Sequence, residues 1–170
     1  MPLLHSIEKD FLKGGAMKRL ICCLLLFSLM LSLVGCGGGG RSAHAMLLEF
    51  SESYGIYGIL YSPEIREGDA GYIDKDFFSS IFSSEPDFET DYAVFLSSSI
   101  ESVYEAALFV AMDESSRLYA QDLCRRRILF LTEMGYGENA VLIGRKNTVF
   151  YSTLPDNERA EQLWRSVKIG

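Results

Sequence analysis

The sequence has few of the residues that catalytic and metal sites use most often. Its 170 residues include two histidines, His5 and His44, and a single tryptophan, Trp164. His5 precedes the expected domain and His44 lies at its edge. A Ser-His or Cys-His mechanism and a histidine-ligated zinc site are therefore excluded from the domain core. We expect no catalytic residues, no metal site and no cofactor, and we expect Trp164 to belong to the core.

Positive charge is also scarce. The chain carries 16 Lys+Arg and 23 Asp+Glu. The first 35 residues hold 4 of the basic and 2 of the acidic side chains, so the remaining 135 residues carry 12 basic and 21 acidic groups, a net charge of −9. Binding to nucleic acid depends on lysine and arginine that neutralise phosphates. We therefore exclude nucleic acid as a partner.

The domain also lacks a pair of cysteines that could form a disulfide. The chain has four cysteines: Cys22, Cys23, Cys36 and Cys124. The first two lie in a segment that we expect to be removed, and Cys36 is a candidate lipidation site, as argued below. A single remaining thiol cannot form an internal disulfide. We expect Cys124 to be a small buried residue on a helix rather than a reactive thiol.

One long apolar run is present, from Leu20 to Val34, directly after the basic pair Lys18 and Arg19. Its 15 residues fit a secretory signal peptide and are too few for a membrane-spanning helix, which needs about 20. We therefore interpret residues 17–35 as a signal peptide. Residues 1–16 precede its basic start, and we interpret them as an upstream extension from a misassigned start codon, with Met17 as the true first residue.

The end of this run predicts a lipid anchor. The sequence Leu33-Val34-Gly35-Cys36 resembles the bacterial lipobox, in which the cysteine receives diacylglycerol and becomes the mature N-terminus. Four glycines follow, and glycine-rich chain is typical of a flexible tether. Residues 36–42 are thus predicted to be anchor and tether at the extracytoplasmic face of the cell membrane. The alternative is an ordinary signal peptide that contains a cysteine.

The remaining residues, 43–170, predict a single α+β domain. Apolar spacing and capping residues predict helices from Ala43 to Gly55, after Asp74, from Asp113 to Met134-Gly135, and after Pro155-Asp156. Strands are expected at 92–96, 103–112, 140–143 and 148–152, although 103–112 also fits a buried helix. Residues 54–72 are left open between strand and loop. The order favours an antiparallel sheet of about four strands, a β-β-α-β-β-α core, packed against helices behind an N-terminal amphipathic helix. The sheet's second face is left either exposed or covered by that first helix.

Three polar or aromatic groups are candidate sites. Carboxylates alternate along 85–91 (Glu85, Asp87, Glu89 and Asp91) and offer oxygen ligands for calcium. The segment lacks the glycine and closing glutamate of a calcium loop, so we interpret it, like Asp74 and Asp76, as a solvated acidic segment. Arg125, Arg126 and Arg127 either recognise an anionic group or are solvated or paired with local acids. Tyr54, Tyr57 and Tyr61 either line a small pocket or pack conventionally.

The pattern resembles a family of small lipoproteins of Gram-positive gut bacteria that carry a domain of unknown function. The similarity rests on the lipobox and on the residues that match the family's order: Tyr72-Ile73-Asp74, Glu105 to Met112, one of Arg125 to Arg127, Tyr136, and Ala140 to Tyr151. It covers most of 43–167. The family usually has an extra stretch between the tyrosine and the hairpin, which is absent here. The resemblance implies a location and a fold, but no reaction.

Three functions follow from these features. The first is a non-catalytic, lipid-anchored binding or interaction module, with an envelope or membrane protein as a possible partner. The alternative is a small-ligand-binding accessory lipoprotein of a transport system, although 135 residues are too few for two closing lobes. The third is an envelope hydrolase with paired carboxylates, which needs two of them at a defined separation.

Overall fold

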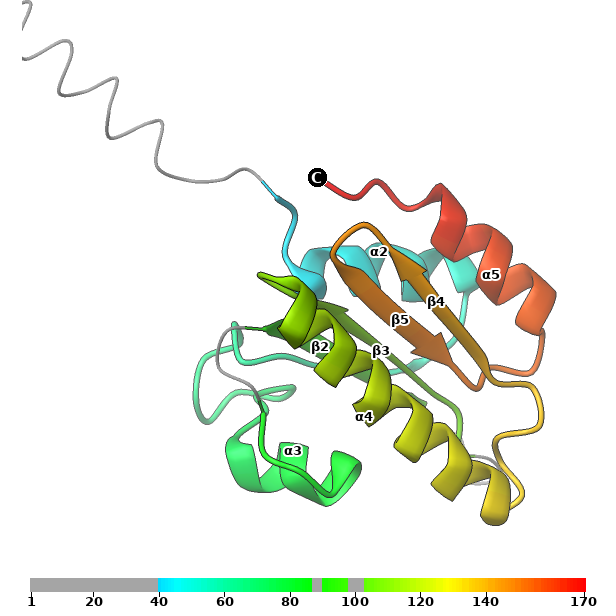
Figure 1. Ribbon diagram of the computed structural model, residues 1–170, viewed down its shortest axis with the longest axis horizontal. Helices are drawn as coiled ribbons and strands as arrows, with labels where there is room; N and C mark the ends of the chain where they lie inside the picture. Colours follow the sequence, from blue (N-terminus) through cyan, green and yellow to red (C-terminus); the bar gives the residue numbers. More distant parts are fainter. Residues whose placement is uncertain (1–39, 87–89, 98–102) are drawn as a thin grey trace, which may run out of the picture. The chain divides into compact units, whose positions relative to one another are not determined.

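The computed structural model describes residues 40–86, 90–97 and 103–170. The chain from Gly40 to Gly170 forms one compact unit. A five-stranded sheet runs through it, with neighbouring strands in the order β1-β2-β3-β5-β4 and every pair antiparallel (Figure 1). The strands are β1 (Gly58–Tyr61), β2 (Asp91–Ser97), β3 (Glu105–Val110), β4 (Val141–Arg145) and β5 (Thr148–Ser152).

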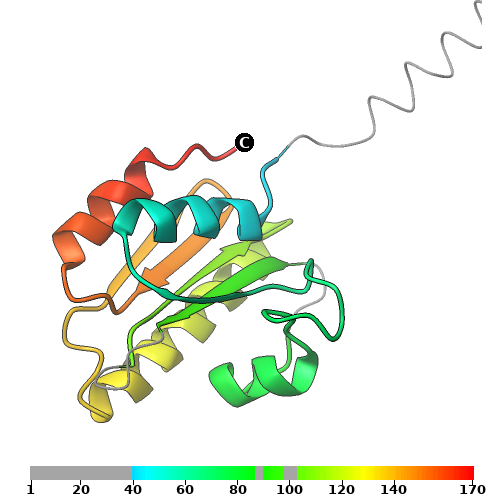
Figure 2. The same cartoon turned by 180° about the vertical axis from the view of Figure 1, so that it is seen from behind.

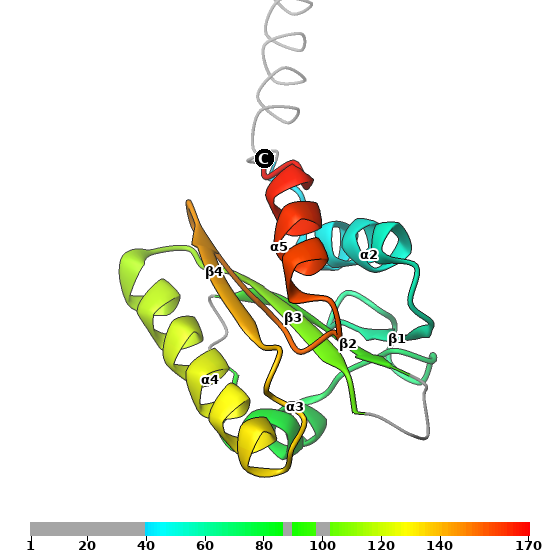
Figure 3. The same cartoon turned by 90° about the vertical axis from the view of Figure 1, so that its right-hand side faces the viewer.

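Helices cover both faces of the sheet. Helices α2 (Ala43–Tyr54) and α5 (Asn157–Ser166) lie on one face, and α3 (Lys75–Phe82) and α4 (Glu114–Glu133) lie on the other (Figures 2 and 3). The α+β class and the antiparallel sheet are confirmed. The strand count is five rather than about four, because residues 58–61 within the segment left open form an edge strand. The face left undecided by the sequence is covered by the first helix together with the last.

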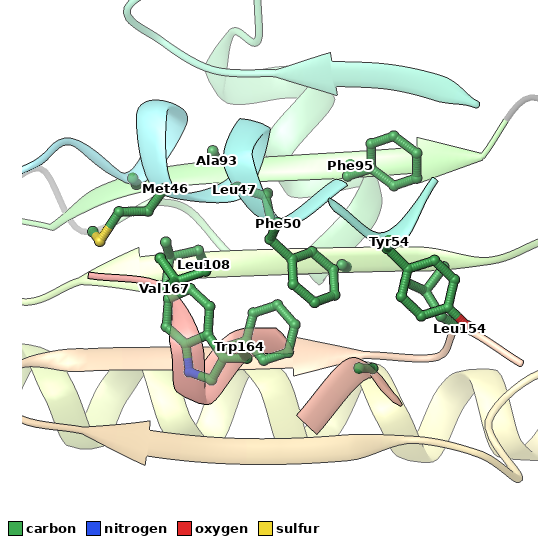
Figure 4. Close-up of a cluster of buried hydrophobic side chains, with 14 residues drawn as sticks. Met46, Leu47, Phe50, Tyr54, Ala93, Phe95, Leu108, Leu154, Trp164 and Val167 are labelled. Carbon is green, nitrogen blue, oxygen red and sulfur yellow. The ribbon is translucent and has the colours of Figure 1, made fainter. Parts of the chain in front are cut away.

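One core lies between the sheet and α2 and α5. The rings of Phe150 and Trp164 stack with centroids 4.6 Å apart, and Phe50 meets Phe150 edge-on at 4.8 Å. All three side chains are fully buried, and Figure 4 shows Phe50 and Trp164 between the helices and the strands. Trp164 thus belongs to the core, as expected. Burial of aromatic surface on this scale makes this cluster a main source of stability.

A second core lies on the opposite face, under α3 and α4. Phe78 and Phe82 of α3 contact Phe109 of β3, and Tyr92 of β2 contacts Phe78. Alternating strand residues therefore supply both cores, which explains why β3 and β5 are buried almost throughout. The apolar run expected at 103–112 is a strand, not a helix, and it is shorter than expected at both ends.

Local capping sets the ends of the helices. The side chains of Ser42, Asp74, Asp113 and Asp156 each accept a hydrogen bond from a backbone N–H in the first turn of the helix that follows. Helix α4 ends through Gly135, whose φ of +83° lies in the left-handed region that favours glycine. The four expected helices are confirmed because these signals act within a few residues.

The elements meet at two opposite ends of the domain. We call the end at which α2 begins the α2 end. Four short segments converge there: residues 41–43, 110–113, 145–148 and 167–170. Ala43 N–H donates to Asp91 Oδ2 at 2.7 Å, Asn147 exchanges hydrogen bonds with Ala111, and Arg41 donates to the Lys168 carbonyl at 3.3 Å. Helix α4 starts at this end and extends 20 residues, about 30 Å, to the other.

Candidate functional site

A buried ion pair joins β3 to α4. Glu105, the first residue of β3, is 0% exposed, and Arg127 of α4 is paired with it through two parallel hydrogen bonds. Arg127 Nε lies 2.8 Å from Glu105 Oε1, and Nη2 lies 2.7 Å from Oε2. The remaining nitrogen, Nη1, donates to the Ile81 carbonyl of α3 at 2.9 Å. One guanidinium therefore connects two helices and the sheet.

Tyr151 and Cys124 complete this cluster. The Tyr151 hydroxyl donates to Glu105 Oε1. Burial, and then the negative charge of Glu105, raise the pKa of Tyr151 well above its ordinary value, and the same two causes raise the pKa of the Cys124 thiol. Burial by itself lowers the pKa of Arg127, but the hydrogen bonds and charge of Glu105 outweigh it and raise that pKa.

Tyr151 and Cys124 of this cluster are therefore unsuited to act as a base or a nucleophile near neutral pH. Tyr151 and Cys124 remain protonated at neutral pH, and the expectation that Cys124 is buried is confirmed. A thiol becomes nucleophilic only as thiolate, which its surroundings disfavour. Arg127 has committed its donors to Glu105 and Ile81, so it has little left for a ligand. Of the two readings offered for the three arginines, pairing applies to Arg127 and also to Arg126, which lies 3.0 Å from Asp122.

Next to this cluster, the α3–α4 junction leaves a hollow of about 110 Å³. It is lined by Ser80, Ile81, Phe82, Ser83, Arg126, Arg127 and Phe130. Small-molecule sites usually enclose about 300–1,000 Å³. This hollow is therefore too small for an organic ligand of ordinary size.

Exposed apolar side chains gather at the far end of α4. Leu129 is 63% exposed, Phe130 51%, Met134 58% and Tyr136 38%. We call these four residues the α4 tip. Phe130 and Met134 are one helical turn apart and therefore neighbours on the surface. The guanidinium of Arg127 lies over the Phe130 ring, 5.3 Å from its centroid, and restrains that ring.

The α4 tip lies outside the inward face of the helix that the sequence predicted. That inward face, which includes Ala120, Leu123 and Leu131, is buried as expected. The tip was not predicted, because the helical face identified from the sequence contains only residues that face the core. The available signal was a second apolar group out of phase with the first, at positions 129, 130 and 134.

A larger hollow of about 390 Å³ lies between α2 and β1. Leu48, Ile56 and Tyr57 line it together with the backbone around Gly58. Tyr57 is 88% exposed at its rim. Of the three tyrosines considered as a pocket, only Tyr57 lies here.

The other two tyrosines serve different contacts on opposite faces of the sheet. Tyr54 is buried with the α2–α5 core, and its hydroxyl accepts a hydrogen bond from Asp156 N–H at 3.0 Å. Tyr61 packs edge-on against Phe77 beside the α3–α4 core, 4.9 Å between centroids. The three rings do not converge, so the pocket reading of this group is wrong and conventional packing applies to Tyr54 and Tyr61.

The acidic segment 85–91 is only partly described. Asp87 and Glu89 lie outside the described residues. Asp91 accepts a hydrogen bond from the Ala43 N–H at the start of α2, and Asp74 caps α3. Within 40–86, 90–97 and 103–170, no group of three acidic, cysteine or histidine side chains is arranged to hold a metal ion.

The predicted upstream extension (1–16), the predicted signal peptide (17–35) and the predicted lipidation site Cys36 also lie outside the described residues. No helix in the described part of the chain is both long and apolar enough to cross a membrane. No protein-family model, curated protein or solved structure matches the chain.

Proposed function

We propose that this protein is a non-catalytic interaction module, held at the extracytoplasmic face of the cell membrane by lipid on Cys36. Its α4 tip binds a membrane or envelope protein. The resemblance to small Gram-positive lipoproteins belongs to the same proposal and supports the location. Two acyl chains on a single cysteine provide stable anchoring, whereas one chain is marginal.

The observation that carries the proposal is the exposure of the α4 tip. Three large apolar side chains, Leu129, Phe130 and Met134, are each more than half exposed within one short stretch of a domain that carries a net negative charge. Contiguous apolar side chains rimmed by polar ones are typical of protein contact sites, and aromatic residues and methionine are enriched in them. Arg125 and Glu133 supply the polar rim.

The position of the tip fits the same role. The tether enters the domain at the α2 end, and α4 extends about 30 Å from there to the tip. A contact surface placed away from the anchor remains accessible to other proteins. The buried ion-pair cluster, whose tyrosine and thiol stay protonated, supports a structural role for these polar side chains.

Photo-crosslinking in intact cells tests this function. A photoreactive amino acid replaces Leu129 in the full chain, and a control replaces Leu118, which is 52% exposed on the same helix near its other end. We expect a discrete adduct from position 129 only, and its loss when Phe130→Ser and Met134→Ser are added. Equal adducts from both positions, or none from 129, contradict the proposed surface.

The second candidate, a small-ligand accessory of a transport system, is favoured by the hollow between α2 and β1. Its volume of about 390 Å³ falls within the range of small-molecule sites. Leu48→Trp fills this hollow from its α2 side. A ligand panel that raises the Tm of the full chain, but not that of the Leu48→Trp variant, would favour this candidate over the interaction module.

A further inference from the structure

The α2 end carries a small surface suited to a lipid membrane. Met112, two residues after β3 ends, is 80% exposed. Asn147 of the β4–β5 turn exchanges hydrogen bonds with Ala111, which places Met112 beside the turn. Lys146 in that turn and Lys168 after α5 are both exposed. Lys146 Nζ lies 3.5 Å from the Gly170 carbonyl, which brings the turn and the C-terminal segment together.

Acidic side chains at this end are already engaged. Glu49 pairs with Arg41 at 2.5 Å, and Glu114 pairs with Arg117 at 2.5 Å. Asp113 is bound to the first turn of α4 through Ser116 N–H. Lys146 and Lys168, in contrast, form no ion pair within the described part of the chain. The Lys168 ammonium is therefore available to an anionic partner, and the Lys146 ammonium is held only by a long hydrogen bond to Gly170, at 3.5 Å.

The backbone of Lys146 fits a two-residue turn. Its φ is +51°, in the left-handed region that lysine seldom adopts and that asparagine or glycine favours in two-residue turns. The two-residue turn between β4 and β5 itself requires a positive φ, and at the tip of this hairpin the Lys146 side chain is exposed.

The length of the tether decides which partner this surface meets. Five residues separate Cys36 from Ser42, and even fully extended they span only about 20 Å. Helix α4 alone is about 30 Å long. With Cys36 in the membrane, the α2 end is thus held within a short distance of the lipid headgroups.

We infer that the α2 end docks on the anionic lipid surface through Met112, Lys146 and Lys168, which fixes the domain with its α4 tip away from the membrane. Interfacial binding combines burial of an apolar side chain with attraction of basic side chains to anionic headgroups. The inference rests on the proposed lipid anchor at Cys36. It adds an orientation that the anchor alone does not impose.

Fluorescence quenching by headgroup-labelled lipid tests this orientation. The full lipidated chain is purified from membranes and reconstituted in phosphatidylcholine vesicles with a quarter phosphatidylglycerol. A fluorophore is attached to Ser115→Cys or to Glu133→Cys. Both positions are exposed on α4, near opposite ends and about 27 Å apart. Cys124 is fully buried and does not compete for the label.

We expect the label at 115 to be quenched at least about twofold more than the label at 133, because docking holds position 115 near the headgroup quencher and position 133 lies about 27 Å farther along α4. The charge reversal Lys146→Glu with Lys168→Glu should abolish this difference. Arg125→Glu with Arg126→Glu changes the net charge equally on the far half of α4 and should preserve it. Replacing phosphatidylglycerol with phosphatidylcholine should reduce the difference as the lysine variant does.

Flotation of the vesicles separates the two ways to fail. Protein that does not float with lipid overturns the anchor and this inference together. Protein that floats, but whose two labels are quenched equally, overturns the orientation and leaves the anchor intact. The orientation also fails if both pairs of charge variants have the same effect.

Discussion

When folding removes Glu105 from water, its carboxylate loses the hydrogen bonds that water donates. Arg127 replaces these hydrogen bonds and adds a compensating positive charge. Removing one partner of a buried ion pair typically costs about 3–5 kcal/mol, since the other charge remains buried. We expect Arg127→Ala to lower the free energy of unfolding by roughly this amount, measured by urea denaturation. Arg126→Ala, one residue away and half exposed, should cost at most about 1 kcal/mol.

A second variant separates the buried charge from the loss of packing. Glu105→Gln combined with Arg127→Ala leaves no ion in the interior. It should be more stable than Arg127→Ala alone. If the double variant is less stable than either single variant, the carboxylate is stabilised by groups other than Arg127, and our account of the cluster is wrong.

Tyr151 and Cys124 predict the behaviour at high pH. Their pKa values are raised in the folded state, and burial raises the pKa of Tyr92 to about 12. The unfolded chain therefore loses these protons first, above about pH 9 for the thiol and pH 10 for the phenols. Stability is complete below these values and falls as pH rises, by about a factor of ten in the unfolding constant per pH unit for each group.

Urea denaturation from pH 8 to 11 measures this loss of stability. Tyr151→Phe removes one of the titrating groups. Above pH 10 its stability should fall with pH more gradually than that of the wild type, even though the variant starts from lower stability. Parallel curves for the two proteins would show that Tyr151 titrates alike in both states.

At the residue scale, the sequence indicated little of the ion-pair cluster. Glu105 is separated from Arg127 by 22 residues and from Tyr151 by 46. Which of Arg125, Arg126 and Arg127 would face Glu105 depended on the rotation of α4 about its axis and on the register of the sheet. Neither can be read from the sequence. A lone acid at the start of an apolar strand was visible, but its partners were set only by tertiary packing.

Strand β1 rests on a close backbone approach. A Cβ at Gly58 would lie 2.2 Å from the Leu96 carbonyl oxygen of β2 and 2.4 Å from the Phe95 ring. We expect Gly58→Ala to displace β1 and to cost roughly 1–3 kcal/mol, as overpacking usually does. Amide hydrogen exchange should accelerate across residues 58–61 while β3 and β5 stay protected.

The opposite edge of the sheet offers a matched control. Gly144 lies in the edge strand β4, and a Cβ there would meet its nearest neighbours at 3.7 Å or more, an ordinary contact. Gly144→Ala should therefore leave exchange unchanged in both edge strands. Acceleration in the control as large as in Gly58→Ala would argue against the steric explanation.

At the scale of elements, the helices could be predicted and β1 could not. The signals that start the helices are local in sequence, because each capping side chain lies within three residues of the N–H that it satisfies. Strand β1 is four residues long and is defined by its pairing with β2, from Gly58 with Ser97 to Tyr61 with Val94. The glycines in and before this segment are as compatible with a loop as with a strand, so the local sequence did not distinguish the two.

At the scale of the whole molecule, the lipid anchor gives the simplest prediction. Cys36→Ala removes the thiol that accepts diacylglycerol. We expect the variant to lose labelling by a fatty-acid probe and to leave the membrane fraction, while the fold of residues 43–170 is unchanged. Retained labelling and retained membrane association in Cys36→Ala would exclude Cys36 as the anchor.

Arg127 also bears on how the protein meets proteases. Helix α3 has only eight residues, and an isolated helix of this length is marginal in water. Because Arg127 donates to the Ile81 carbonyl near the end of α3, this helix cannot open without breaking a hydrogen bond of the guanidinium that is paired with Glu105 of β3. Proteases cleave segments that open locally, so cooperative unfolding leaves them few partial openings to attack. A single guanidinium would then influence how long the domain survives outside the cytoplasm.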